Sequence, residues 1–150
     1  SIEIMSEFKY LPHRIELVKN SNDIKWFNDS KSTNVSSTIA ALEYVNNNII
    51  LIMGGANKNL DYSKLSPYID AHAKLVILLG ENSSSLADQI SSQIDIKRVQ
   101  TMTEAIQLAS ENAIALDSVL LSPASPSFDM YKNFEERGIA FRQAVKELVK

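Results

Sequence analysis

The sequence predicts a three-layer α/β domain with a mostly parallel sheet, helices on both faces and an antiparallel hairpin at its start. Two observations predict this fold class. Continuous apolar runs at 48–53 and 73–79 are typical of strands that are buried on both faces, as strands of parallel sheets are. Segments with the periodicity of amphipathic helices alternate with these runs. That alternation is typical of Rossmann-like domains.

Two short β-prone runs, 15–18 and 24–27, open the regular structure. The five residues KNSND between them are rich in turn formers, so the two strands are expected to form an antiparallel hairpin. A helix is expected over 35–45, where apolar residues recur with i, i+4, i+7 spacing. Three polar residues just before it could cap its first turn, namely Ser32, Thr33 and Asn34.

The rest of the chain alternates strands with helices. The run 48–53 ends at a pair of glycines and the run 73–79 ends at Gly80, which marks the end of each strand. A weaker strand over 96–99 and a last strand over 118–122 complete the predicted sheet. Amphipathic patterns predict the remaining helices at 62–71, 83–93, 102–116 and 134–148.

Composition narrows the range of functions. A chain of 150 residues with 45% hydrophobic residues can bury one core, so we expect a single domain over 1–150. A net charge of −3 gives no general attraction to nucleic acid or to a membrane surface. The chain has no cysteine and two distant histidines, so neither a disulfide nor a zinc site is expected. Without a signal peptide or a long apolar run, a cytoplasmic location is expected.

Three polar segments follow predicted strands. Parallel-sheet domains bind ligands beyond the carboxyl ends of their strands, so we expect NDSKSTN (28–34), GGANKNLD (54–61) and SPASPSFD (122–129) to meet there. In the first segment a helix N-terminus offers backbone N–H donors and Lys31 adds a positive charge, which suits a phosphate or a carboxylate. Taken alone, that segment is better explained as an ordinary helix cap with a solvated lysine.

The glycines exclude two nucleotide-binding motifs. The four glycines of the chain fit neither the P-loop pattern nor the dinucleotide fingerprint. Any nucleotide would therefore have to be held mainly by another part of the protein. A Ser-His-Asp hydrolase is also disfavoured, because neither histidine lies in a suitable context. No residue stands out as a catalytic acid or base.

Four segments, taken together and in order, resemble the C-terminal domain of the Mur ligases. They are LPHR (11–14), NDSKSTN (28–34), IMGGANKNLDYSKL (52–65) and LSPASPSFDMYKNFEERG (121–138). The resemblance covers nearly the whole chain. It implies a cytoplasmic, ATP-dependent, three-domain enzyme of peptidoglycan synthesis. This chain would be the third domain, inactive alone, with the UDP-binding domain and the central P-loop domain absent.

The resemblance also implies a reaction and its partners. ATP, with Mg²⁺, would phosphorylate the carboxyl group of UDP-N-acetylmuramoyl-L-alanine. The amine of D-glutamate would then attack the acyl phosphate and form the amide. The central domain would hold most of the ATP and the Mg²⁺, and this domain alone would bind neither tightly. The enzyme is expected to be a monomer that binds neither nucleic acid nor membrane.

The resemblance assigns two groups of site residues. Arg14, Asp29 and Lys31 match positions that close over ATP, with Arg14 and Lys31 on the phosphates and Asp29 on the ribose side. A second group matches positions that hold D-glutamate, with Phe134 against its apolar stem. This group is Thr33, Lys58, Ser127, Phe128 and Phe134.

Two other interpretations stay open on the sequence alone. The chain could be a free-standing domain that binds an acidic amino acid or a nucleotide through the same loops. It could also be a structural or interaction module whose polar junctions only cap helices. Binding of D-glutamate but not L-glutamate would separate both ligand-binding interpretations from the structural one.

Overall fold

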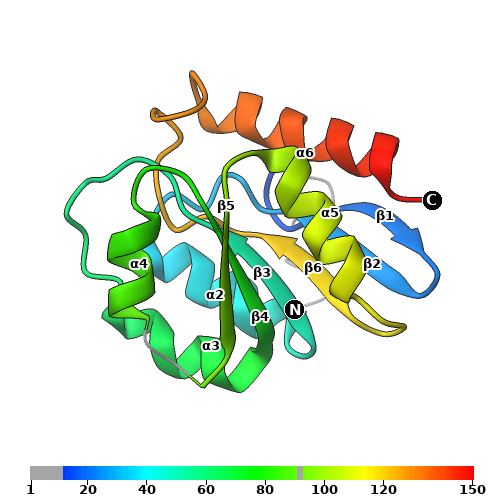
Figure 1. The fold of residues 1–150 in the computed structure, drawn as a ribbon, viewed down its shortest axis with the longest axis horizontal. Coiled ribbons are helices and arrows are strands. Elements are labelled where there is room, and N and C mark those ends of the chain that lie inside the picture. Colours follow the sequence, from blue (N-terminus) through cyan, green and yellow to red (C-terminus); the bar gives the residue numbers. More distant parts are fainter. Residues whose placement is uncertain (1–11, 91–92) are drawn as a thin grey trace.

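The protein is a three-layer α/β domain, described by a computed structural model over residues 12–90 and 93–150 (Figure 1). Residues 1–11 and 91–92 lie outside the described part, and with them the first residue of the LPHR segment. The helix predicted over 83–93 is shorter than predicted, because it ends at Gln89, before residues 91–92. A six-stranded sheet forms the middle layer. Its strands are β1 (Glu16–Ser21), β2 (Ile24–Asn28), β3 (Ile49–Met53), β4 (Ala73–Leu79), β5 (Asp95–Val99) and β6 (Ser118–Leu121).

The order of the strands across the sheet is β1-β2-β6-β3-β4-β5. The β1–β2 pair is antiparallel, and the other pairings among the described strands are parallel. This arrangement confirms the predicted fold class, including the hairpin at the start. The last strand in sequence, β6, lies between β2 and β3 and pairs with both.

Helices cover both faces of the sheet (Figure 1). Among the helices of residues 12–90 and 93–150, none is both long enough and apolar enough to cross a membrane. One face carries α2 (Val35–Val45), η1 (Ser63–Leu65), α3 (Ser66–His72) and α4 (Ser83–Gln89), and the other carries α5 (Met102–Asn112) and α6 (Phe134–Leu148).

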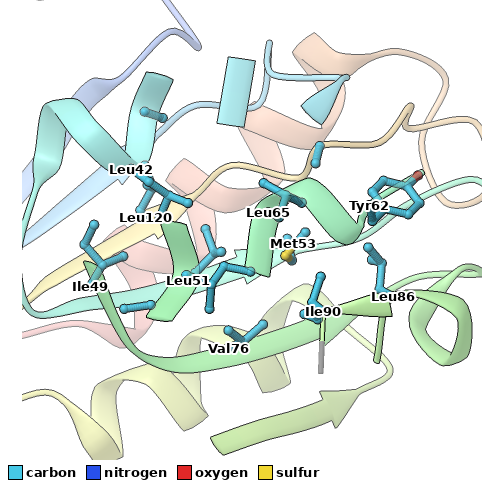
Figure 2. Packing of buried hydrophobic residues seen from close by; sticks show 14 of the residues in the cluster. Leu42, Ile49, Leu51, Met53, Tyr62, Leu65, Val76, Leu86, Ile90 and Leu120 are labelled. Atoms are coloured by element: carbon cyan, nitrogen blue, oxygen red, sulfur yellow. The ribbon is translucent and has the colours of Figure 1, made fainter. Parts of the chain in front are cut away.

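Strand β3 shows why its sequence is apolar throughout. Its five residues are all buried, and successive side chains point to opposite faces of the sheet. Leu51 therefore packs with Leu42 and Leu65 beneath α2 and η1 (Figure 2), whereas Ile50 and Ile52 join the cluster beneath α5 and α6. Each such side chain contributes roughly 1.5–3 kcal/mol through burial. The core thus lies on both sides of the sheet and fixes the strand ends.

The hairpin is tighter than the sequence predicted. The prediction of a five-residue turn over 19–23 is wrong, because β1 continues to Ser21, which pairs with Ile24. Only Asn22 and Asp23 form the turn, and their φ angles of 55° and 61° are both positive. A two-residue turn of this kind matches the right-handed twist of the strands. Polar residues are compatible with strand β1 because it is an edge strand.

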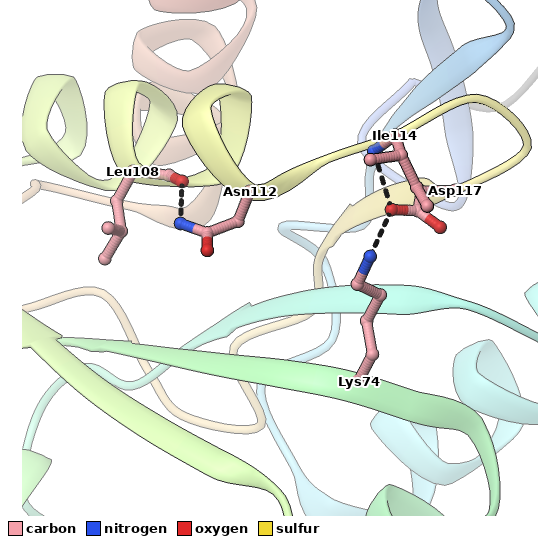
Figure 3. Close-up of polar contacts among 5 residues, drawn as sticks. All are labelled: Lys74, Leu108, Asn112, Ile114 and Asp117. Atoms are coloured by element: carbon pink, nitrogen blue, oxygen red, sulfur yellow. Dashed lines mark hydrogen bonds and ion pairs between the residues drawn. The ribbon is translucent and has the colours of Figure 1, made fainter.

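Helix α5 is shorter than predicted. The predicted span was 102–116, but the helix ends at Asn112. Asp117 then holds the connection to β6, since its carboxylate accepts hydrogen bonds from the backbone N–H of Ile114 at 2.8 Å and from Lys74 Nζ at 2.6 Å (Figure 3). The apolar residues beyond Asn112 continued the helical spacing without belonging to the helix.

The helix predicted over 62–71 is divided into η1 and α3. Pro67 lies in the first turn of α3, where its missing N–H costs no helical hydrogen bond. Because Pro67 has no N–H to donate to the Ser63 oxygen, that oxygen accepts from the Ser66 N–H instead, and the preceding turn is a 3₁₀ turn. The division leaves Tyr62 in front of η1, with its hydroxyl directed to the loops described below.

Two positions test the role of left-handed backbone in the fold. Gly54 has a φ of 118°, and a Cβ there would lie 2.2 Å from the backbone oxygen of Leu79. We expect Gly54→Ala to lower the free energy of unfolding by roughly 3 kcal/mol or more. Leu116 has a φ of 76° and a side chain that is 76% exposed. As the matched control, Leu116→Gly should raise stability by roughly 0.5 kcal/mol. Urea unfolding measures the free energy of unfolding of both variants. A small effect of Gly54→Ala, similar in size to that of Leu116→Gly, would contradict the prediction.

Candidate functional site

Three loops meet at the carboxyl edge of the sheet, as the sequence predicted. They follow the adjacent strands β2, β6 and β3. Backbone hydrogen bonds join them: the Asp29 N–H donates to the Leu121 oxygen at 2.8 Å, and the Gly54 N–H donates to the Pro123 oxygen at 3.0 Å. The loops are therefore fixed to one another where the strands end.

Asp29 is the central acceptor of this junction. Its Oδ1 accepts a hydrogen bond from the Ile15 N–H at 3.1 Å, and its Oδ2 accepts from Ser32 Oγ at 2.5 Å and Ser122 Oγ at 2.7 Å. Asp29 is only 1% exposed. One carboxylate thus joins the segment before β1, the loop after β2 and the loop after β6.

Burial dominates the titration of Asp29. Loss of water raises the pKa of its carboxyl group to about 6, although the hydrogen bonds from Ser32, Ser122 and Ile15 each lower it. Because the folded-state pKa lies above the ordinary value of 3.8, folding favours the protonated form. The ionised form therefore costs stability, and this cost grows as the pH rises toward 6 and is complete above it.

A hollow of ≈ 370 Å³ lies beside Asp29. Arg14, Asp29 and Lys31 all line it, so the structure brings together the three residues predicted to face ATP. Asn34 lines it as well and caps α2, since its Oδ1 accepts a hydrogen bond from the Ser37 N–H at 2.9 Å. We call this space the Arg14 hollow. It combines two cationic side chains with a helix N-terminus.

Lys58 and Phe128 form a second feature on neighbouring loops. The Lys58 ammonium nitrogen lies 5.0 Å from the centre of the Phe128 ring, and the ring is largely exposed. Beneath this pair, the Gly55 N–H donates to Asn82 Oδ1 at 2.9 Å, and Asn82 Nδ2 donates to Ser125 Oγ at 2.9 Å. The buried amide of Asn82 therefore holds the loops that present the two exposed groups.

The other predicted residues lie around these two features. Ser127 is buried, and its backbone oxygen accepts a hydrogen bond from the Tyr131 N–H at 2.8 Å. Phe134 begins α6, with its ring edge-on to His13 at 6.2 Å between centroids. Thr33 is half-buried in the loop before α2. Within the described residues, no side-chain hydrogen bond or ring contact joins Thr33 to Lys58, Phe128 or Phe134.

The sequence analysis missed Arg137. This residue lies within the NFEERG stretch but is only 3% exposed, and three of its guanidinium N–H groups donate to oxygens of Ser30 and Ser125. Burial lowers its pKa to about 10, while the charges of Asp129, Tyr131 and Asp29 oppose that shift. In sequence, an arginine that follows two glutamates on a helix looks like an exposed residue. Nothing local marked it as buried.

A larger hollow of ≈ 480 Å³ lies beyond β4 and β5. Glu81, Arg98 and Asp129 line it, but it contains none of the predicted site residues. Its mixture of opposite charges does not favour a particular ligand. Within the described part of the chain, no group of three or more His, Cys, Asp or Glu residues is placed to hold a metal ion.

Comparison with known proteins identifies the family. The family model described as "Mur ligase, glutamate ligase domain" matches residues 13–125, which include the first two loops and part of the third. The chain belongs to this family. It is 44% identical over 150 residues to the UDP-N-acetylmuramoylalanine–D-glutamate ligase of Nitrosococcus oceani, covering 99% of this chain and 33% of that enzyme. The chain thus spans about a third of the length of its curated relatives.

Solved structures of other proteins share the fold. A murein peptide ligase from Psychrobacter arcticus superposes with a TM-score of 0.63 at 14% identity, over 92% of this chain and 31% of that one. E. coli FolC in complex with ADP gives a TM-score of 0.63 at 17% identity, over 91% of this chain and 32% of that one. At these identities the likeness supports the Mur ligase domain fold and nothing finer.

Asp29→Asn tests the buried carboxylate. Asparagine keeps one oxygen for the Ile15 N–H, and its amide can donate to the serine hydroxyls, so the network survives without the charge. From about pH 5 to pH 7 we expect the wild-type chain to lose roughly 1 kcal/mol of stability relative to Asp29→Asn.

Urea unfolding at several pH values measures this difference. Ser122→Ala is the matched comparison, because it keeps the carboxyl group but removes a hydrogen bond that lowers its pKa. Its stability should fall more steeply over the same pH range. The prediction would be contradicted if the free energies of unfolding of the wild-type chain and of Asp29→Asn changed with pH in parallel.

Proposed function

We propose that this chain is the C-terminal domain of a UDP-N-acetylmuramoylalanine–D-glutamate ligase. The observation that carries the proposal is the 44% identity, over 99% of the chain, to an enzyme of that name. The site geometry supports it, because the matched loops converge at the edge where such sheets bind ligands. The UDP-binding domain and the P-loop domain would lie outside this chain, in the two thirds of its relatives that it does not match.

The proposed reaction joins D-glutamate to UDP-N-acetylmuramoyl-L-alanine in peptidoglycan synthesis. ATP would transfer its γ-phosphoryl group to the alanyl carboxylate, and the amine of D-glutamate would attack the acyl phosphate and release phosphate. We propose a cytoplasmic, monomeric enzyme. The domain alone would be inactive, because the reacting groups meet only when it closes over the rest of the enzyme.

The Arg14 hollow would receive ATP. Arg14 and Lys31 would contribute positive charge toward the phosphate oxygens. Asp29 would serve the ribose side. A carboxylate has about four acceptor positions. The three hydrogen bonds to Asp29 leave one acceptor position, on Oδ1, for a ribose hydroxyl.

Mg²⁺ would accompany the nucleotide in the complete enzyme. The described residues offer no acidic cluster for it, so we assign its ligands to the ATP phosphates and to the part of the enzyme outside this chain. Bound there, it would neutralise charge on the transferred phosphoryl group. The solved FolC relative was crystallised with ADP, which is consistent with a nucleotide-using architecture.

The Lys58–Phe128 side of the junction would receive D-glutamate. Lys58 is exposed and cationic, as one carboxylate of the substrate requires. Thr33 and Ser127 would supply directed hydroxyl or backbone donors. Phe128 and Phe134 would cover the apolar stem of the amino acid. Thr33 belongs to the same loop as Asp29 and Lys31, so one loop would serve both ligands.

Two lysine substitutions separate the two halves of the site. In the complete enzyme, Lys58→Met should raise KM for D-glutamate about tenfold or more while KM for ATP stays near its wild-type value. Lys31→Met should raise KM for ATP by a similar factor while KM for D-glutamate stays near its wild-type value. Each change removes one charge and keeps most of the apolar stem. Steady-state release of phosphate at varied concentrations of each substrate measures both constants.

Lys64→Met is the control, because Lys64 is exposed in η1 and lines none of the hollows described above. It should leave both constants unchanged. L-Glutamate in place of D-glutamate should give no product. A complete enzyme that forms no D-glutamyl amide would refute the proposed function, and unchanged KM values in both lysine variants would refute the residue assignment alone.

A further inference from the structure

Arg137 connects the loops of the site through one planar group. Its Nη2 donates to the Ser30 backbone oxygen at 2.8 Å and its Nε donates to Ser30 Oγ at 3.0 Å. On the other side its Nη1 donates to the Ser125 backbone oxygen at 2.9 Å. The guanidinium therefore holds the loop after β2 and the loop after β6 at a fixed separation.

The same connection continues into α6. Ser30 Oγ accepts a hydrogen bond from Arg137 and donates one to the backbone oxygen of Phe134 at 2.7 Å. A Cβ on Gly55 would lie 3.3 Å from Arg137 Nη1, so the guanidinium also lies close to the loop that carries Lys58. The loops after β2, β3 and β6 and the start of α6 thus all approach this one cation.

Each connection lies close in sequence to a residue of the proposed site. Ser30 stands between Asp29 and Lys31, on the nucleotide side. Ser125 lies two residues before Ser127, on the amino-acid side. A rotation of either loop about its strand end would break a hydrogen bond to Arg137. The position of one half of the site is therefore tied to the position of the other.

Arg137 is buried and lines neither of the two hollows described above. It is 3% exposed, and its hydrogen-bond partners are neutral oxygens of the protein. Arginine suits this position because its donors are held in a rigid plane, whereas a lysine ammonium is a single flexible point. Arg137 therefore joins the loop after β2 to the loop after β6.

We propose that Arg137 is a positioning residue that couples the nucleotide half of the site, Asp29 and Lys31, to the amino-acid half, Lys58, Ser127 and Phe134. This inference rests on the proposed function. Through Ser30 and Ser125, Arg137 sets the distance between the bound nucleotide and the attacking amino acid. Small errors in such a distance reduce catalysis strongly, because the reacting groups lose alignment.

The test uses the complete enzyme with Arg137→Lys, which keeps the charge but cannot reach three oxygens at once. KM for ATP and KM for D-glutamate should both rise, by about tenfold, with a fall in kcat. Ser30→Ala removes the hydroxyl that Arg137 and Phe134 share, and should raise both constants by a smaller factor. Because the two changes share the hydrogen bond from Arg137 Nε to Ser30 Oγ, the effect of the double variant on each KM should be smaller than the product of the two single effects.

Val145→Ala is the matched control for stability. Val145 is fully buried in α6 and packs in the core cluster away from the loops, so its truncation should lower Tm without changing either KM. Variants of Arg137 and Ser30 that lower Tm but leave both KM values within about twofold of wild type would overturn the inference. A change in only one KM would also overturn it, because coupling requires both to move.

The outcomes separate this inference from the proposed function. If the wild-type enzyme forms no D-glutamyl product, the proposed function is wrong. If the wild-type enzyme is active and the Arg137→Lys enzyme has wild-type KM values for both ATP and D-glutamate, the proposed function stands and the positioning role is wrong. Ser30→Ala keeps the buried charge in place, so it gives an answer even if Arg137→Lys fails to fold.

Discussion

The insertion of β6 between β2 and β3 is the constraint on which the site depends. Parallel pairing on both sides of β6 brings the ends of β2, β6 and β3 to one edge, although these strands come from distant parts of the chain. The loops that follow then touch through backbone hydrogen bonds such as that from Asp29 to Leu121. Without that strand order, the polar segments that resemble the Mur ligases would lie apart.

Two buried charges stabilise the geometry of this edge at a cost to folding. Asp29 joins three segments through its carboxylate, and Arg137 joins two loops to α6 through its guanidinium. Burial raises the pKa of the first to about 6 and lowers that of the second to about 10, so both ionised forms oppose folding. Their hydrogen bonds offset part of this cost and give the loops one defined arrangement.

Four of the groups proposed to touch ligands contrast with this buried framework. Arg14, Lys31, Lys58 and Phe128 are exposed and extend from loops whose backbones are fixed beneath them. Exposed groups on a rigid support suit a domain that must meet a nucleotide held mostly by another part of the enzyme. Little of the binding energy would then be spent on ordering the loops during closure.

The sequence alone determined the alternation of elements, because the spacing of apolar residues reflects which side chains face the core: the run 48–53 contains β3, 73–79 is β4, and 35–45 is α2. It also determined the family, through four ordered segments. Helix ends were less predictable, since the end of α5 depends on Asp117 contacting Lys74 and the Ile114 backbone, and Lys74 is distant in sequence. Only the tertiary structure decided the strand order, the burial of Asp29 and the role of Arg137. These depend on contacts between distant segments, and local periodicity carries no information about such contacts.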